Sequence, residues 1–180
     1  MQLDITGLMA MITEFKPVVP THVIQIISTY SQSGDSRLYD KAVENPMYVS
    51  KRRYVFDDVW PGLHERDTGL ITPVISGTII SDFVEAREAG CEGLVVHCTR
   101  GINRSPAVGM ALNRIFELGY DQREMRQKFP EFTHYVYRII LEEGARRGIG
   151  PGFDVEFERQ FAFDAAAKNT MMQGFARRSS

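Results

Sequence analysis

Val95 to Ser105 reads Val-Val-His-Cys-Thr-Arg-Gly-Ile-Asn-Arg-Ser, and the fold of the chain is best derived from this stretch outward. Its apolar first residues predict the end of a buried strand, and the apolar residues that follow it at helical spacing predict a helix. Five residues separate Cys98 from Arg104. They can curl into a cup, with Gly101 relieving the tight curvature. We therefore predict a strand, a phosphate-sized loop and a helix N-terminus.

Such a cup binds an oxyanion, because its N–H groups converge and the following helix points its positive end into the same space. The Arg104 guanidinium can bind two phosphate oxygens as a fork. The same field stabilises a thiolate, which predicts that Cys98 is a nucleophile near neutral pH. We expect Ser105 to stabilise that thiolate when it leaves, and His97 to orient the loop through hydrogen bonds. The remaining phosphate donors are expected to be the backbone N–H groups of Thr99, Arg100, Gly101, Ile102 and Asn103.

The pattern His97-Cys98-x-x-Gly101-x-x-Arg104-Ser105 resembles the full signature of the cysteine-based protein tyrosine phosphatases, especially their compact dual-specificity branch. The resemblance implies a phosphocysteine intermediate on Cys98, phosphate binding by the loop and Arg104, and an aspartic acid on a separate upstream loop. Taken alone, a cysteine after a buried strand is usually a small hydrophobe, and an arginine at a helix start is usually solvated. The combination of fixed positions favours the catalytic interpretation.

The upstream acid has three candidates. Cleavage of a phosphate ester expels an oxyanion that a carboxylic acid can protonate. Asp57 and Asp58 end an expected strand, where the resemblance places the acid, and alternation prevents both side chains from facing the cup. We favour Asp58. Asp67 is the alternative, because its separation from Cys98 is closer to the spacing associated with the family. Residues 59–71 are expected to form a long mobile loop that either carries the acid itself or covers a site served by Asp58.

Strands and helices alternate along the chain. This alternation predicts an α/β fold, a three-layer sandwich with a largely parallel central sheet and helices on both faces. Thr29–Ser50 is expected to be a loop with one helical turn, and Lys51–Arg53 a solvated strand entry. The expected strands are Leu3–Thr6, His22–Ser28, Tyr54–Phe56 and Leu94–Val96. The expected helices are Leu8–Phe15, Thr72–Gly90, Pro106–Leu118 (with Gly119 as its C-cap), Asp121–Lys128 and Thr133–Arg147.

The chain has 180 residues, 43% of them hydrophobic, which suits one domain with a substantial core. We assign residues 1–150 to a single phosphatase domain. Residues 151–180 are expected to form an amphipathic helix, with Phe153, Phe157 and Phe161 on one face, and a disordered tail. The helix is expected to dock on the domain or to mediate a dimer.

The amino-acid composition limits the cellular compartment and the classes of binding partner that we expect. The formal net charge is −2, so no overall basic footprint points to nucleic acid. The strand between Cys91 and Cys98 should keep the two thiols too far apart for a disulfide, which favours the reducing cytoplasm. No apolar run is long enough for a transmembrane helix, and we expect no membrane association. The four histidines are scattered, so neither a metal site nor a cofactor is expected.

The sequence thus predicts a metal-independent phosphomonoester hydrolase that acts on a phosphorylated protein, with protein-tyrosine or dual specificity. A first alternative is an RNA 5′-triphosphatase, because Cys98-Thr99 and Ile102–Arg104 resemble the loop of the cysteine-dependent capping phosphatases. A phosphoinositide phosphatase is a second, although Arg100 is the one basic residue in the cup besides Arg104. A phosphate-binding module without turnover is a third, and it would not need a thiolate.

Overall fold

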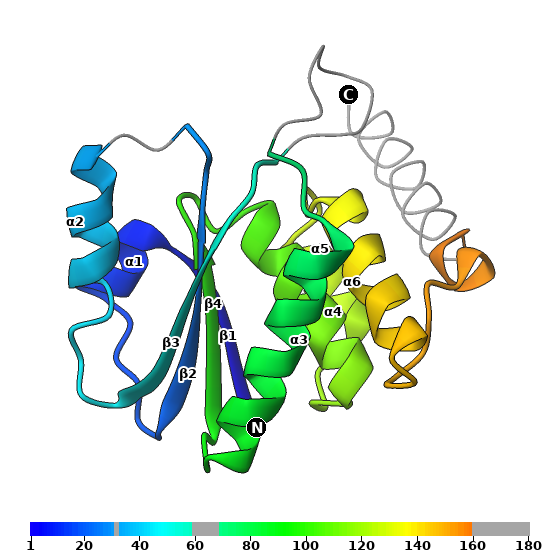
Figure 1. The fold of residues 1–180 in the computed structure, drawn as a ribbon, viewed down its shortest axis with the longest axis horizontal. Helices are drawn as coiled ribbons and strands as arrows, with labels where there is room; N and C mark the ends of the chain where they lie inside the picture. Colours follow the sequence, from blue (N-terminus) through cyan, green and yellow to red (C-terminus); the bar gives the residue numbers. More distant parts are fainter. Residues whose placement is uncertain (31–32, 59–68, 160–180) are drawn as a thin grey trace, which may run out of the picture.

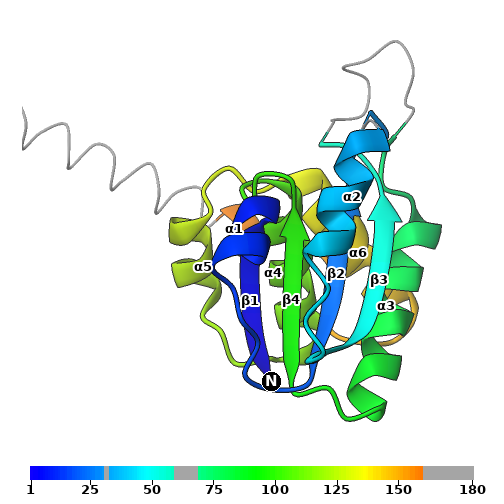
Figure 2. The ribbon, with the colours of Figure 1, turned by 90° about the vertical axis from the view of Figure 1, so that its left-hand side faces the viewer.

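The structure is a computed structural model that describes residues 1–30, 33–58 and 69–159. Within these residues, four strands form one parallel sheet in the order β1-β4-β2-β3. Figure 2 shows the four strands pointing the same way, so their carboxyl ends share one edge. The strands are β1 (Gln2–Gly7), β2 (Thr21–Ile27), β3 (Tyr48–Val55) and β4 (Gly93–Cys98).

Helices cover both faces of this sheet, which confirms the predicted α/β fold. The helices lie on the two faces, and α5 (Gln122–Lys128) lies beside the edge of β1 (Figures 1 and 2). One face carries α1 (Leu8–Thr13) and α2 (Ser33–Lys41). The remaining helices are α3 (Pro73–Glu88), α4 (Arg104–Phe116), α5 (Gln122–Lys128) and α6 (His134–Arg146).

The central strands are buried on both faces, which explains their continuous apolar sequences. On β2, Val23 packs under α1 and α2, whereas Ile24 and Ile26 join the larger core under α3, α4 and α6. On β4, Val95 belongs to the core under α1 and α2, and Cys98 belongs to the larger core on the other face. The alternation of side chains along a strand therefore places Cys98 on the face covered by α4.

Helix ends follow the expected capping chemistry at two positions. The Thr72 hydroxyl accepts a hydrogen bond from Ile75 N at 3.2 Å, and Pro73 begins α3. The Asp121 carboxylate accepts two backbone N–H groups at the start of α5. The expected C-cap of α4 is wrong: the helix ends at Phe116, and Glu117 takes the left-handed conformation with φ 49°.

The interpretation of Thr29–Ser50 as a loop is wrong, because α2 and the beginning of β3 lie inside it. Tyr39, on α2, is buried against the sheet, and this tertiary contact stabilises a helix whose sequence is otherwise polar. The Lys51–Arg53 triplet lies within β3, not at its entry, and its side chains are exposed on this edge strand.

The chain beyond α6 returns to the domain. Residues 155–159 are helical, and the Glu158 carboxylate pairs with Arg126 at 2.8 Å and with Arg114 at 3.5 Å. Arg114 also lies over the Phe157 ring, 3.9 Å from its centroid. The first part of the expected C-terminal helix thus packs against α4 and α5. Phe161 and the expected tail lie outside the described residues.

Both cysteines are free thiols, as predicted. In the described parts of the chain, every helix is too short or too polar to cross a lipid bilayer.

Candidate active site

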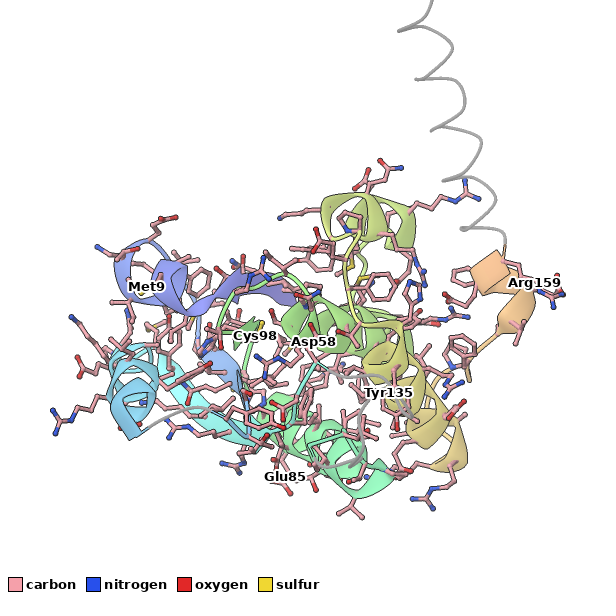
Figure 3. All side chains as sticks on the ribbon, turned by 90° about the horizontal axis from the view of Figure 1, so that it is seen from above. Met9, Asp58, Glu85, Cys98, Tyr135 and Arg159 are labelled. Carbon is pink, nitrogen blue, oxygen red and sulfur yellow. The ribbon has the colours of Figure 1, made fainter. Side chains whose placement is uncertain are left out.

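Cys98 ends β4 at the centre of the sheet, with β1 on one side and β2 on the other. In the view onto the carboxyl ends of the strands, Cys98 and Asp58 lie in the middle of the molecule, between Met9 on α1 and Tyr135 on α6 (Figure 3). This is the edge where parallel α/β sheets bind their ligands. The elements on both faces therefore converge on Cys98.

The sulfur of Cys98 is buried, and two groups that can donate hydrogen bonds point at it. Gly101 N donates to Sγ at 3.2 Å, and the Ser105 hydroxyl lies 3.3 Å from Sγ. The same hydroxyl lies 3.3 Å from the carbonyl oxygen of Thr6. A hydroxyl carries one proton, so Ser105 can donate to a thiolate only by turning away from Thr6. This arrangement can stabilise a sulfur that alternates between a thiolate and a covalent intermediate.

The cup is shaped by close contact with the junction of β1 and α1. Gly101 has φ 77°, and a Cβ there would lie 2.5 Å from Gly7 N. A Cβ on Gly7 would in turn lie 2.8 Å from the carbonyl oxygen of Arg100. Leu8 N donates to the carbonyl oxygen of Thr99 at 3.2 Å. Two glycines therefore allow two backbones to meet, and side chains there would separate them.

Arg104 is the first residue of α4, and the residue is 8% exposed. It donates to the carbonyl oxygen of Phe56 at 2.8 Å, which holds it between the helix and the end of β3. Of the other predicted phosphate-binding residues, Thr99 and Arg100 are exposed, Ile102 and Asn103 are half-buried, and Gly101 is buried.

The far side of the cup is fixed to the start of α6. Asn103 Nδ2 donates to the carbonyl oxygen of Glu131 at 2.8 Å, and the Asn103 carbonyl accepts Thr133 N at 3.2 Å. The loop is therefore attached to β1 at one end and to α6 at the other.

The two adjacent aspartates face different surroundings, as the alternation of a strand predicts. Asp57 is buried, and its carboxylate accepts Thr29 N at 3.0 Å and the hydroxyls of Ser28 and Thr29. Asp58 is exposed and accepts a hydrogen bond from the Thr133 hydroxyl. Because Thr133 also binds Asn103, Asp58 lies beside the cup, while Asp57 is engaged with the end of β2. Asp67 lies outside the described residues, as does most of the expected loop 59–71.

His97 does not act as expected. Its side chain points away from Cys98, to the face covered by α2, and stacks on Tyr39 with ring centroids 5.6 Å apart. Neither ring nitrogen has a hydrogen-bond partner among the described residues. Burial, with a smaller contribution from the Arg53 charge, lowers the pKa of His97 to about 4. The imidazole is therefore a neutral packing group, and its predicted hydrogen bonds to the loop are wrong.

Sequence reasoning missed three residues of this site: Gly7, Tyr39 and Thr133. Gly7 stands between a strand and a helix, a position where a close backbone approach is common and could have been suspected. Thr133 was identified as a helix start but not as a partner of Asp58. Tyr39 carried no local signal, because its contact with the cup joins residues that are 60 positions apart in the sequence.

Within residues 1–30, 33–58 and 69–159, no three His, Cys, Asp or Glu side chains gather closely enough to hold a metal ion.

Comparison with known proteins gives matches to solved structures. No family model and no curated protein matches the chain. The chain is similar to Tk-PTP in its active form, with 15% identity and a TM-score of 0.48 over 81% of this chain and 93% of that one. It is similar to PTPMT1, with 15% identity and a TM-score of 0.46 over 82% and 94% of the two chains.

A third similar structure is TpbA of P. aeruginosa, with 12% identity and a TM-score of 0.38 over 71% of this chain and 67% of that one. All three are cysteine-based protein tyrosine phosphatase family members. The chemistry of the site therefore rests on its own residues.

Proposed function

We propose that this protein is a cysteine-dependent phosphomonoester hydrolase with protein-tyrosine or dual specificity. One observation carries the proposal: the buried Cys98 sulfur lies between Gly101 N–H and the Ser105 hydroxyl, at the N-terminus of α4 and six residues before Arg104. A structural cysteine needs no such donors, whereas a thiolate that attacks phosphorus needs them in both steps of the reaction.

In the first step, the Cys98 thiolate attacks phosphorus, so a sulfur–phosphorus bond forms while the bond to the ester oxygen breaks. The N–H groups of the cup and the Arg104 guanidinium stabilise the equatorial oxygens of the transferring phosphoryl group. Asp58, on the far side of the cup from β1, gives its proton to the departing oxygen. This step yields phosphocysteine, the free alcohol or phenol and an ionised Asp58.

In the second step, a water molecule attacks phosphorus and the sulfur–phosphorus bond breaks. The Asp58 carboxylate takes the proton of that water, and inorganic phosphate is released. The thiolate that leaves receives hydrogen bonds from Gly101 N–H and from Ser105, which supports its departure. In this scheme Arg104 and the helix N-terminus supply the positive charge, so no metal or cofactor takes part.

The experiment is phosphate release from five substrates by the full chain, with Cys98→Ser as the control. The substrates are a phosphotyrosine peptide, its phosphoserine and phosphothreonine counterparts, 5′-triphosphorylated RNA and a vesicle-borne phosphoinositide. We expect the phosphotyrosine peptide to be hydrolysed fastest and the Cys98→Ser variant to be inactive on all. Faster release from the RNA, or from the phosphoinositide, would replace the proposed substrate, and peptide binding without release would indicate a binding module.

A further inference from the structure

We infer that Tyr39 is a positioning residue for the phosphate cup, acting through a hydrogen bond to the Thr99 side chain. The inference rests on the proposed function and adds a residue of α2, a helix far from the signature in sequence. Tyr39 is 1% exposed and packs with Leu8 and Val95 in the core between the sheet, α1 and α2. Its hydroxyl reaches the residue that directly follows Cys98.

Either hydroxyl can be the donor of this hydrogen bond. The Tyr39 oxygen lies 2.9 Å from Thr99 Oγ1 and 3.3 Å from the Ile26 carbonyl oxygen. A phenol carries one proton. When that proton is given to Ile26, the Thr99 hydroxyl donates to Tyr39. When it is given to Thr99, Tyr39 is the donor, and the two hydroxyls are hydrogen-bonded in both cases. Tyr39 therefore links the carboxyl end of β2 to the first residue of the cup.

Tyr39 is itself held rigidly. Gln25 Nε2 donates to the Tyr39 carbonyl oxygen at 2.7 Å. Gln25 Oε1 accepts from the Arg53 guanidinium at 3.2 and 3.3 Å, and Arg53 pairs with Asp40 at 2.7 Å. The neutral His97 ring stacks on the Tyr39 ring. A bond from a rigid group costs little entropy when it forms, so it can fix its partner.

Thr99 is consequently held twice. Its carbonyl oxygen accepts a hydrogen bond from Leu8 N at 3.2 Å, and its side-chain hydroxyl is hydrogen-bonded to the Tyr39 hydroxyl. These two bonds fix the peptide that leaves Cys98 and so the direction of the first N–H groups of the cup. Without the Tyr39 hydroxyl, the packing remains but this restraint is lost, and the cup should bind oxyanions less tightly.

The test compares Tyr39→Phe with Tyr48→Phe in the full chain. Tyr48 is a matched control: it is buried in the same core, and its hydroxyl has no hydrogen-bond partner among the described residues. Two readouts are needed, kcat/KM for p-nitrophenyl phosphate and the affinity for inorganic phosphate by calorimetry. Thr99→Val removes the same hydrogen bond by deleting the Thr99 hydroxyl. The double variant Tyr39→Phe/Thr99→Val lacks both hydroxyls.

We expect Tyr39→Phe to lower both kcat/KM and phosphate affinity by about threefold to tenfold, the worth of one hydrogen bond. Tyr48→Phe should change neither. The double variant should be no worse than Thr99→Val, because both substitutions remove one bond. Unfolding by urea establishes that each variant is folded, and Thr99→Val carries the test if Tyr39→Phe does not fold.

Three results would overturn the inference: full activity and phosphate affinity in Tyr39→Phe, equal losses in Tyr39→Phe and Tyr48→Phe, or additive losses in the double variant. A chain that binds phosphate, weakens with Tyr39→Phe and never turns over would refute the proposed function but retain the role of Tyr39. A chain that neither binds phosphate nor turns over would refute both.

Discussion

The Asp58 carboxylate accepts a hydrogen bond from the hydroxyl of Thr133, which lies 75 residues further along the chain. Thr133 N also donates to the carbonyl oxygen of Asn103, in the cup. One residue thus joins the end of β3, the start of α6 and the phosphate loop. This contact distinguishes Asp58 from Asp57, whose carboxylate binds groups at the end of β2.

Replacement of Asp58 tests its role as the acid. Asp58→Asn keeps the size and the contact with Thr133 but removes the proton that the leaving oxygen needs. We expect kcat for phenyl phosphate to fall by about 10²- to 10⁴-fold, and kcat for p-nitrophenyl phosphate to fall less, because its leaving group is a weaker base. Equal activity of variant and wild type on both esters would exclude Asp58 and make Asp67 the next candidate.

Replacement of Asp57 should affect stability instead. Asp57→Asn leaves buried donors from Ser28 and Thr29 facing a neutral amide in place of a carboxylate, at a cost of about 1–3 kcal/mol. Urea denaturation at pH 7 measures this cost. We expect kcat for phenyl phosphate in folded Asp57→Asn to stay near that of the wild type. A stable variant with the kinetic defect expected of Asp58→Asn would reverse the roles of the two residues.

Two of the glycines with positive φ, Gly90 and Gly101, allow backbone strain to be separated from crowding. Gly90 has φ 88° with open space around it, while Gly101 has φ 77° and faces Gly7 N. Gly90→Ala should cost about 1–2 kcal/mol of unfolding free energy, the penalty of the left-handed conformation, and leave activity unchanged. Gly101→Ala should cost more and reduce kcat/KM on the order of a hundredfold, because the cup loses its shape. Identical effects of the two substitutions would contradict the close contact between the cup and β1.

The free energy of unfolding should decrease as the pH is lowered, in a pH range set by two buried histidines. Burial lowers the pKa of His22 and of His97 from 6.5 to about 4. The unfolded chain therefore takes up protons first, so the free energy of unfolding is fully present above pH 6.5 and declines as pH falls towards 4. The loss is on the order of 3 kcal/mol per histidine.

Glu143 does not interfere in this window. Hydrogen bonds from Arg146, with further bonds from Arg147, lower the pKa of Glu143 to about 2, so its contribution is lost only below pH 4.5. Urea denaturation at several pH values between 7 and 4.5 measures the slope, which should decrease in His97→Asn. A flat profile in the wild type would show that these side chains are not held neutral in the fold.

Local patterns predicted the parts of the site that adjacent residues build. The apolar end of β4, Gly101 and the start of α4 follow from one short stretch, because strand, turn and helix signals are local there. The burial of Cys98 and the different surroundings of Asp57 and Asp58 follow from alternation along a strand.

The remaining parts depend on contacts between distant segments. Tyr39 and Thr99 are 60 residues apart, and nothing in either neighbourhood indicates that they meet. The helix α2 was missed for the same reason, since it is stabilised by the burial of Tyr39 and Ala42 against the sheet and not by a strong helical pattern. The orientation of His97 could not be predicted from the sequence, because it depends on which face of β4 the side chain lies on. That face is identified by the packing of α2, which was itself missed.

The most direct measurement of the central claim is hydrolysis of p-nitrophenyl phosphate in excess chelator by the wild type, Cys98→Ser and Cys91→Ser. Cys91 is the matched control, a second buried and free thiol at the opposite end of β4. The account predicts that the wild type and Cys91→Ser hydrolyse the ester in chelator and that Cys98→Ser does not. Full activity in Cys98→Ser, or loss of wild-type activity on chelation, would contradict catalysis by the Cys98 thiolate.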